Sequence, residues 1–340
     1  MKKIVFVACV GGYSGAENLT LLIANELSKC GYLVIYASPR GVIEGYLSQY
    51  PNINYEPFEF NLFSLMNMLN KTRPDVVYTV DFKVSMLCSL LPFPIVTHLH
   101  NNPTWLQKKS IFTLLLLYSM NKAKANICVS DSIMDEFVFS KYVHTNTKTI
   151  SNVVDEDKVI TLANMPLDKK YDLCFIGRLT EQKDPLRFIR IVNKINQFQN
   201  NNVSAVMIGI DGGLQEECEI LVKNNDLNID IVGFQNNPYK FIANSRLTIM
   251  PSKWEGFGLT AVESMILGVP VLGTGVGGLR NVIGFVDRIC VTDEEFVNLS
   301  CKLLNDDNLY SQTQIEVKNQ ARKFTSIKEY SKKIIQMIEG

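Results

Sequence analysis

The 340-residue sequence has no net charge, because 34 Lys and Arg residues balance 34 Asp and Glu residues. Charge therefore gives no indication of nucleic-acid binding. The eight cysteines include no Cys-x-x-Cys pair. They mostly lie in apolar runs, so we expect reduced core thiols of a cytoplasmic protein.

Long apolar runs are also missing. The N-terminal run, Ile4–Val10, ends in Gly-Gly and precedes a polar helix pattern, so we interpret it as a first β-strand rather than a signal peptide. The segment Ile111–Met120 is too short to cross a membrane, which needs about 18 apolar residues or more.

Short apolar runs instead alternate with helix-like segments along the chain. The helix-like segments have apolar residues three and four positions apart, a combination that predicts parallel sheets covered on both faces. The predicted strands are Lys3–Val10, Leu33–Ala37, Asp75–Val80, Ile95–Leu99, Ala125–Val129, Thr147–Ile150, Tyr171–Ile176, Val203–Ile208, Ile229–Val232, Leu247–Met250, Val269–Gly273 and Arg288–Val291. The predicted helices include Ala16–Lys29, Leu62–Lys71, Phe82–Leu91 and residues 185–199, 213–224, 237–244, 258–267 and 294–305, with helix alone after Tyr310.

The alternation pauses once, at the polar stretch Asn152–Pro166. Two βα arrays separated by one pause predict an α/β protein of two Rossmann-like, doubly wound domains with a cleft between them. We expect an N-terminal domain (1–152), a linker (153–168), a C-terminal domain (169–322) and a C-terminal helix (323–340). Ligands bind at the carboxyl ends of such strands, so the chemistry is expected in the loops that follow them.

The first such loop, Gly11–Glu17, is rich in glycine and opens a helix. Its spacing is not Gly-x-Gly-x-x-Gly, and no acidic residue ends the second strand, which disfavours a nicotinamide dinucleotide. We predict no cofactor. A tight βα turn explains these glycines as well as a ligand does.

The loop Gly177–Asp184 follows the first strand of the second array. It carries Arg178 and Lys183, five residues apart, and two cations at a sheet edge suit a diphosphate. A solvated loop is the alternative.

The third segment, residues 251–270, holds Glu255 in a loop and Glu263 eight residues later on a predicted helix. The amides of Gly258, Leu259 and Thr260 at the start of that helix suit an anion. Ordinary surface charge would also explain two glutamates, but less well within the sequence EGFGLTAVE.

These motifs resemble those of the retaining glycosyltransferases of family 4, which have the GT-B fold with two Rossmann-like domains facing each other across a cleft. The Glu-x7-Glu motif of that family matches Glu255 and Glu263, and its Gly-Arg-Leu-x-x-x-Lys loop matches Gly177–Lys183. The stretch Val232–Phe234 followed by residues 237–239 is similar to the loop that helps hold the nucleotide base, which implicates Gly233 and Phe234. The resemblance spans nearly the whole chain.

The resemblance also implies roles for single residues. Glu263 would hold the ribose hydroxyls and Glu255 would contact the donor sugar. Arg178 and Lys183 would neutralise the diphosphate, and Gly15 would approach the donor from the first domain. The C-terminal helix would pack back on the N-terminal domain.

The family further places a histidine near the sugar at the end of a first-domain strand. Two candidates, His98 and His100, stand on the same face of the strand Ile95–Leu99 and its end. We choose His100 because it is last. The sequence departs from the family at Ser14, where many members have Gly, and at Asp184, where many have Gly after the Lys.

No metal site is predicted. The acidic triplet Asp155–Asp157 lies in the expected linker rather than at a clear strand end, and the cations at Arg178 and Lys183 already supply positive charge. The expected reaction is metal-independent transfer with retention of configuration, in which the departing phosphate can take the acceptor proton.

The resemblance implies transfer of a sugar from a nucleotide-sugar to a saccharide or lipid-linked saccharide in surface-polysaccharide assembly, as in capsule or O-antigen. We expect a UDP-sugar on family frequency, with a GDP-sugar left open. A GT-B sugar-nucleotide epimerase and a catalytically silent nucleotide-sugar-binding protein are the alternatives.

Peripheral contact with the inner membrane face stays open. Residues 1–150 carry 13 Lys and Arg against 10 Asp and Glu, and Lys108, Lys109, Lys122 and Lys124 flank the segment Ile111–Met120. The segment is either an amphipathic helix that touches an anionic membrane or a core helix with solvated ends.

Overall fold

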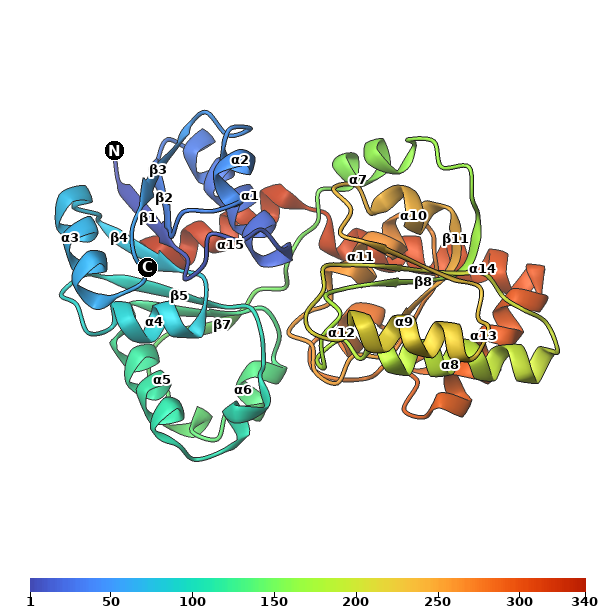
Figure 1. Cartoon of the computed structure of the whole chain (residues 1–340). Coiled ribbons are helices and arrows are strands. Elements are labelled where there is room, and N and C mark those ends of the chain that lie inside the picture. The colour runs from blue at the N-terminus through green and yellow to red at the C-terminus, as the bar shows by residue number, and fades with distance from the viewer. The chain divides into compact units, whose positions relative to one another are not determined.

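The computed structural model describes all 340 residues and divides the chain into two compact units. The first unit comprises Met1–Val153 and Ile327–Gly340, and the second comprises Val154–Ser326. Each unit is built around one parallel sheet (Figure 1), which confirms the predicted α/β architecture of two Rossmann-like domains. No helix combines the length and apolar character needed to cross a membrane.

The first unit contains a seven-stranded parallel sheet in the order β3-β2-β1-β4-β5-β6-β7. The strand order reverses between β1 and β4, which is the position where doubly wound folds bind ligands. The strands are β1 Lys3–Val7, β2 Leu33–Ser38, β3 Ile53–Pro57, β4 Val76–Thr79, β5 Ile95–Leu99, β6 Ala125–Cys128 and β7 Thr147–Thr149. The helices and 3₁₀ turns are α1 Gly15–Lys29, α2 Ile43–Leu47, α3 Leu62–Thr72, α4 Phe82–Cys88, η1 Thr104–Gln107, α5 Ile111–Lys122, α6 Ser132–Glu136, η2 Ser140–Tyr142 and α15 Ile327–Glu339.

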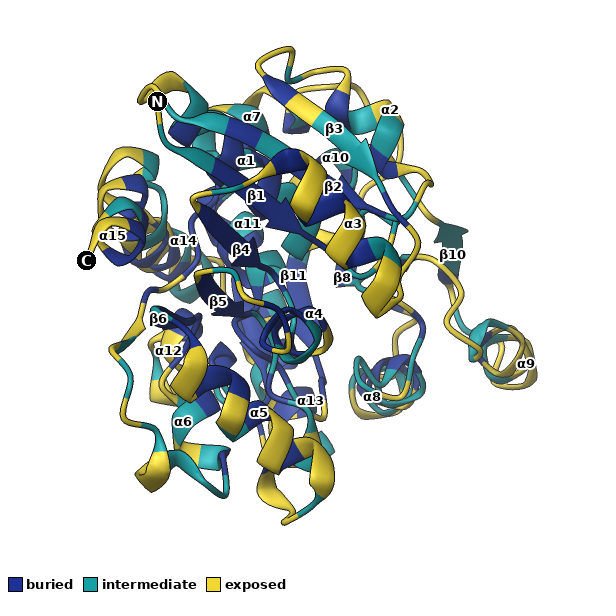
Figure 2. Cartoon of the chain, turned by 90° about the vertical axis from the view of Figure 1, so that its left-hand side faces the viewer, coloured by how far each residue is buried: buried dark blue, intermediate teal, exposed yellow.

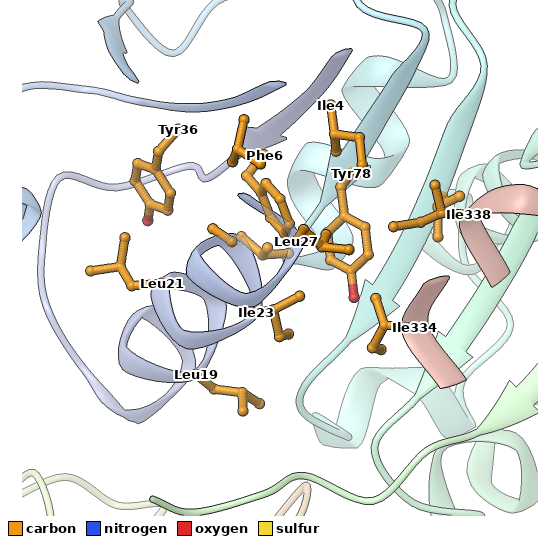
Figure 3. Packing of buried hydrophobic residues seen from close by; sticks show 14 of the residues in the cluster. Ile4, Phe6, Leu19, Leu21, Ile23, Leu27, Tyr36, Tyr78, Ile334 and Ile338 are labelled. Atoms are coloured by element: carbon orange, nitrogen blue, oxygen red, sulfur yellow. The ribbon is translucent and has the colours of Figure 1, made fainter. Parts of the chain in front are cut away.

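Alternate residues of β1 pack on opposite faces of this sheet. Ile4 and Phe6 belong to a core shared with α1 and α15, whereas Val5 and Val7 pack with α3 and α4. The Phe6 ring lies 4.6 Å from that of Tyr78 between centroids, and Figure 3 shows both beside the α1 and α15 side chains. Burial on both faces explains why the strands read as continuous apolar runs.

Helix α15 is the last helix of the chain and packs within the first unit. Its residues Tyr330, Ile334, Met337 and Ile338 are buried in the core formed by β1 and α1. The Lys124 ammonium donates to the carbonyls of Ile338 and Glu339 at 3.0 and 3.2 Å. These cationic contacts satisfy carbonyls at the helix C-terminus, where positive charge is stabilising.

The second unit contains a five-stranded parallel sheet in the order β10-β9-β8-β11-β12. Its strands are β8 Tyr171–Ile176, β9 Ala205–Ile208, β10 Ile229–Gly233, β11 Ser245–Met250 and β12 Val271–Gly273. The helices and 3₁₀ turns are α7 Glu156–Ala163, α8 Pro185–Gln199, α9 Gln215–Asn224, α10 Tyr239–Ala243, α11 Leu259–Ile266, α12 Leu279–Ile283, η3 Val286–Arg288, α13 Asp293–Asn305, α14 Asp307–Ala321 and η4 Arg322–Phe324.

One predicted strand is wrong. The segment Arg288–Val291 forms only a single bridge, between Ile289 and Gly273. Arg288 instead ends the turn η3 and forms an ion pair with Glu316 of α14. This tertiary contact fixes a turn where the apolar pattern alone predicted a strand.

The segment predicted as a linker, residues 153–168, contains helix α7. Asp155 caps this helix, and its side chain accepts a hydrogen bond from the Lys158 amide at 3.0 Å. The acidic triplet Asp155–Asp157 therefore lies at a helix start, where carboxylates stabilise the exposed amides.

Candidate active site

Two loops meet at the carboxyl edge of the second sheet. One follows β8 and the other follows β11, and these two strands are neighbours. The Lys253 amide donates to the Gln182 carbonyl at 2.8 Å, and the Gln182 side-chain amide donates to the Trp254 carbonyl at 3.2 Å. The loops thus hold each other in one conformation, and they carry the predicted residues Lys183 and Glu255.

Lys183 and Glu255 form an ion pair between these loops. The Lys183 Nζ lies 2.8 and 2.6 Å from the two carboxylate oxygens of Glu255. The exposed fractions of the two side chains are only 17% and 9%. A charge-assisted pair with so little exposure is shorter and stronger than a surface pair, so each residue fixes the position of the other.

The helix that follows Glu255 begins at a glycine in the left-handed region. Gly258 has a φ of 99° and precedes α11. A Cβ atom there would lie 2.8 Å from Leu279 Cδ1, so backbone geometry and packing both require glycine. Leu259 and Thr260, the first residues of the helix, are half-buried. Their amides lack intrahelical partners, as at any helix start.

Glu263 lies one turn inside α11. The Tyr239 hydroxyl of α10 donates to Glu263 Oε1 at 3.2 Å. Burial raises the pKa of Glu263 to about 7, although the Tyr239 hydrogen bond and the charge of Lys158 act in the opposite direction. A carboxylate in this setting is stabilised by further hydroxyl donors, such as those of a ribose.

Arg178 extends from the β8 loop into solvent. It is exposed, and its guanidinium makes one long contact, 3.5 Å from Gln182 Oε1. Its loop comes close to the loop after β9, since a Cβ at Gly209 would lie 1.9 Å from the Gly177 carbonyl oxygen. Glycine at position 209 therefore permits the two loops to pack, a requirement that its sequence context did not reveal.

Gly233 and Phe234 lie at the end of β10. Gly233 has a φ of 66° and accepts a hydrogen bond on its carbonyl from the Gly209 amide at 3.0 Å. The chain turns here, and the Phe234 side chain is 54% exposed. An exposed aromatic ring at a strand's carboxyl end can stack on a planar base.

In the first unit, Gly15 begins helix α1. Ser14 precedes it in an extended conformation, and its hydroxyl donates to Glu17 at 2.5 Å. Gly11, at the start of the same loop, packs against residues 39–41. A Cβ at Gly11 would lie 2.4 Å from the carbonyl oxygens of Pro39 and Arg40, and a Cβ at Gly41 would lie 2.4 Å from the Gly11 carbonyl oxygen. This crossing explains Gly11 by packing and identifies Gly41 as a partner that sequence reasoning missed.

The two candidate histidines stack at the end of β5. Their ring centroids are 3.9 Å apart. His98 is fully buried, and its Nδ1 is 2.7 Å from the Tyr78 hydroxyl. His100 is half-buried, and neither of its ring nitrogens has a hydrogen-bond partner in the protein. His98 is thus held by Tyr78 through one ring nitrogen, whereas both ring nitrogens of His100 are buried and lack a hydrogen-bond partner.

Both rings are neutral near pH 7. Burial lowers the pKa of His100 to about 4. Burial also lowers the pKa of His98, with a smaller contribution from His100. Neutral imidazole can both donate and accept a hydrogen bond, which suits sugar hydroxyls better than a phosphate.

Within the second unit the structure thus joins Lys183 directly to Glu255 and places Gly258 between Glu255 and Glu263. Sequence reasoning missed Gln182, which ties the two loops together. It also missed Tyr78, which holds His98. Neither residue has a signal in its local pattern, because each acts through a contact distant in sequence.

Comparison with known proteins identifies both halves of the chain. The model of Glycosyltransferase Family 4 matches residues 13–158, and that of Glycosyl transferases group 1 matches residues 163–324. The structure of Anabaena HepE in complex with UDP and glucose superposes with a TM-score of 0.84 at 19% identity, over the full length of both chains.

Two curated relatives are similar in sequence. An uncharacterized glycosyltransferase of Methanocaldococcus jannaschii is 28% identical over 62% of this chain and 58% of its own length. The GalNAc-alpha-(1->4)-GalNAc-alpha-(1->3)-diNAcBac-PP-undecaprenol alpha-1,4-N-acetyl-D-galactosaminyltransferase of Campylobacter jejuni is 24% identical over the whole of both chains. The chain therefore belongs to the GT-B glycosyltransferases, with a family 4 domain followed by a group 1 domain.

Proposed function

We propose that this protein is a retaining glycosyltransferase that moves a sugar from a UDP-sugar to a lipid-linked saccharide during surface-polysaccharide assembly. The observation that carries this proposal is the ion pair of Lys183 with Glu255 directly before the start of α11. It brings a cation, a carboxylate and helix amides to one sheet edge, which suits a sugar diphosphate.

The proposed donor site uses the carboxyl edge of the second sheet. Arg178, Lys183 and the amides of residues 258–260 would bind the diphosphate. Glu263 would accept hydrogen bonds from the ribose hydroxyls. Gly233 and Phe234 would contact the base. The choice of uracil is supported by the similar fold of HepE, which was crystallised with UDP.

We assign two first-unit residues to the donor sugar, as the family resemblance implies. His100 has two unpartnered ring nitrogens at a strand end, and Gly15 begins a helix without a side chain that would block a ligand. The Campylobacter jejuni relative is named for an acceptor linked to diphospho-undecaprenol, which supports a lipid-linked acceptor here. The eight free thiols support a reducing, cytoplasmic location.

In the proposed reaction the anomeric C–O bond of the donor breaks and its electron pair passes to the nucleoside diphosphate. Arg178, Lys183 and the α11 amides stabilise the developing negative charge. The acceptor oxygen bonds to the anomeric carbon on the face that the diphosphate leaves, and its proton passes to a phosphate oxygen. Glu255 would contact the sugar, and no carboxylate acts as a strong base.

The decisive experiment combines donor screening with product analysis. A thermal-shift screen of UDP- and GDP-sugars identifies the donor, because a ligand that binds the folded state raises its stability. Transfer to an undecaprenyl-diphosphate-linked saccharide is then followed, and the anomeric configuration of the product is read by NMR. We expect a UDP-sugar and retention. An epimerised donor without acceptor, donor binding without turnover, or an inverted product would overturn the proposal.

Metal independence is part of the proposal, and its support is the positive charge of Arg178 and Lys183. Transfer should continue at an unchanged rate after dialysis against EDTA. A loss of activity that returns with Mg²⁺ or Mn²⁺ would contradict metal independence. It would not contradict the proposal that the protein is a glycosyltransferase.

A further inference from the structure

Helix α5 carries two apolar stripes, of which only one is buried. Thr113, Leu116 and Met120 face the core. On the other side Ile111, Leu114, Leu115 and Tyr118 are 64%, 49%, 39% and 49% exposed. Their spacing of three, one and three residues places them on one helix face. A surface helix normally presents polar residues to water, so this second stripe needs another explanation.

Neighbouring elements of the first unit also expose large apolar side chains. Helix α4 lies between α3 and α5 in both views (Figures 1 and 2), and exposed turns of these helices face outward in Figure 2. Phe63 of α3 is 70% exposed, and Leu90, just after α4, is 53% exposed. We call the set the apolar face: Leu62, Phe63, Met66, Leu90, Ile111, Phe112, Leu114, Leu115 and Tyr118.

The helices that carry the apolar face contain lysines but no Asp or Glu, and the exposed Glu59 contacts Asn61 at the start of α3. Residues 60–74 and 82–130, which include α3, α4 and α5, contain no Asp or Glu. Four lysines of the second segment are exposed and form no ion pair: Lys83, Lys108, Lys109 and Lys122. Lys71 of α3 differs, since it pairs with Glu56.

We propose that the apolar face docks on the surface of an anionic lipid membrane. Large apolar side chains can enter the boundary between headgroups and acyl chains, while unpaired lysines beside them attract anionic headgroups. The Tyr118 ring, with Lys122 Nζ 6.0 Å from its centroid, combines an apolar body with a polar end, as residues at a membrane interface do.

The charge pattern favours lipid over a second copy of the chain. A two-fold dimer would place the same patch against itself. The four lysines would then face lysines, with no acidic partner on α3, α4 or α5 to compensate. An anionic membrane supplies both the negative charge and the apolar interior that this face lacks.

This inference goes beyond the proposed function, because binding to a membrane needs neither donor nor acceptor. The test uses the full chain and sedimentation with vesicles of phosphatidylcholine and phosphatidylglycerol, compared with vesicles of phosphatidylcholine alone. One variant combines Ile111→Ser, Leu115→Ser and Tyr118→Ser. A second combines Lys108→Gln, Lys109→Gln and Lys122→Gln.

The matched control changes exposed apolar residues of the second unit: Phe198→Ser, Ile220→Ser and Ile315→Ser, which are 66%, 50% and 64% exposed. Thermal melting of every variant checks that the fold is retained. Since all these side chains are exposed, we expect melting close to that of the wild type.

We expect the wild type and the control to bind the anionic vesicles and to dissociate as salt rises. The apolar variant should lose binding. The lysine variant should bind roughly 100-fold more weakly, from about a factor of five for each lysine near the surface. Equal binding by the apolar variant, or no binding by the wild type, would overturn the proposal. A dimer of the wild type that the apolar variant abolishes would also overturn it, in favour of a second copy.

Discussion

At the scale of single residues, the Lys183–Glu255 pair combines a structural role with a chemical one. Each side chain is mostly buried, so removing the lysine leaves a carboxylate without its partner. We expect Lys183→Met to lower both the melting temperature and the rate of transfer, the latter by about 10²-fold or more. Melting curves and initial rates measure the two effects separately.

A double variant separates these roles. Adding Glu255→Gln to Lys183→Met removes the unpaired charge, so stability should recover while transfer stays low. Lys253→Met is the matched control, because Lys253 is in the same loop as Glu255 but forms only an exposed pair with Glu181. Recovery of transfer in the double variant would show that Lys183 serves only to neutralise Glu255.

Glu263 should make stability depend on pH. Its pKa is raised by burial from the ordinary 4.5 to about 7. Between these values the unfolded chain loses a proton that the folded chain keeps, so the free energy of unfolding falls as pH rises and then stays low above the folded pKa. Glu263→Gln removes this penalty. A shift of this size corresponds to roughly 3 kcal/mol, and roughly 1 kcal/mol changes the melting temperature of such a domain by about 2–4 °C. The variant should therefore melt about 6–12 °C above the wild type at about pH 8 and equally at about pH 4.

The control for this pH dependence is Glu217→Gln, which changes an exposed glutamate of α9. It should follow the wild type at both pH values. A parallel pH profile for Glu263→Gln and the wild type would mean that Glu263 ionises normally in the folded protein.

At the scale of elements, the start of α8 contains a strained residue. Asp184 caps the helix with its side chain and has a φ of 49°. Glycine is favoured at such an angle, which gives a physical reason for the glycine that many family members have there. Asp184→Gly should therefore change the stability by a few tenths of a kcal/mol, because relief of strain offsets the lost cap.

Asp184→Ala has no such compensation. It keeps the unfavourable φ and loses the cap, so it should destabilise the protein by about 0.5–2 kcal/mol. The stabilities of the wild type and the two variants are compared by the midpoints of their denaturant unfolding curves. If alanine and glycine were equivalent, neither the angle nor the cap would matter at this position.

The interior strands and the edge strands β7, β10 and β12 could be predicted from sequence, but the edge strand β3 could not. The interior strands β1, β4 and β8 are apolar runs, and the sequence located each of them. The edge strand β3 reads Ile-Asn-Tyr-Glu-Pro, which is half polar, and it escaped prediction. Its existence depends on pairing with β2, a contact that local pattern does not encode.

The candidate site likewise depends on contacts that the local sequence pattern does not encode. The motifs identified Lys183, Glu255 and Glu263 as site residues, but not that Lys183 bonds both oxygens of Glu255. Residues 72 positions apart meet only because β8 and β11 are neighbours in the sheet. For α5, the sequence left two interpretations open. The structure buries Thr113, Leu116 and Met120 of this helix, as a core helix requires, but also leaves Leu114 and Leu115 in its middle 49% and 39% exposed.

At the scale of the whole molecule, the two units are joined by two chain crossings. The chain leaves the first unit after Val153 and returns to it after Ser326 with α15. The first core is therefore completed only by the last residues of the chain. Ile334 is fully buried there among side chains of β1, β4 and α1.

We expect Ile334→Ala to destabilise the first unit selectively, by about 2–5 kcal/mol. Hydrogen exchange followed by mass spectrometry should show faster exchange in β1 and β4, with β8 and β11 unchanged, if the two cores open independently. Lys333→Ala, at the exposed neighbouring position, serves as the control. Faster exchange in both sheets would instead mean that the units unfold as one cooperative body. In that case α15, although it packs in the first unit, would stabilise the second unit as well.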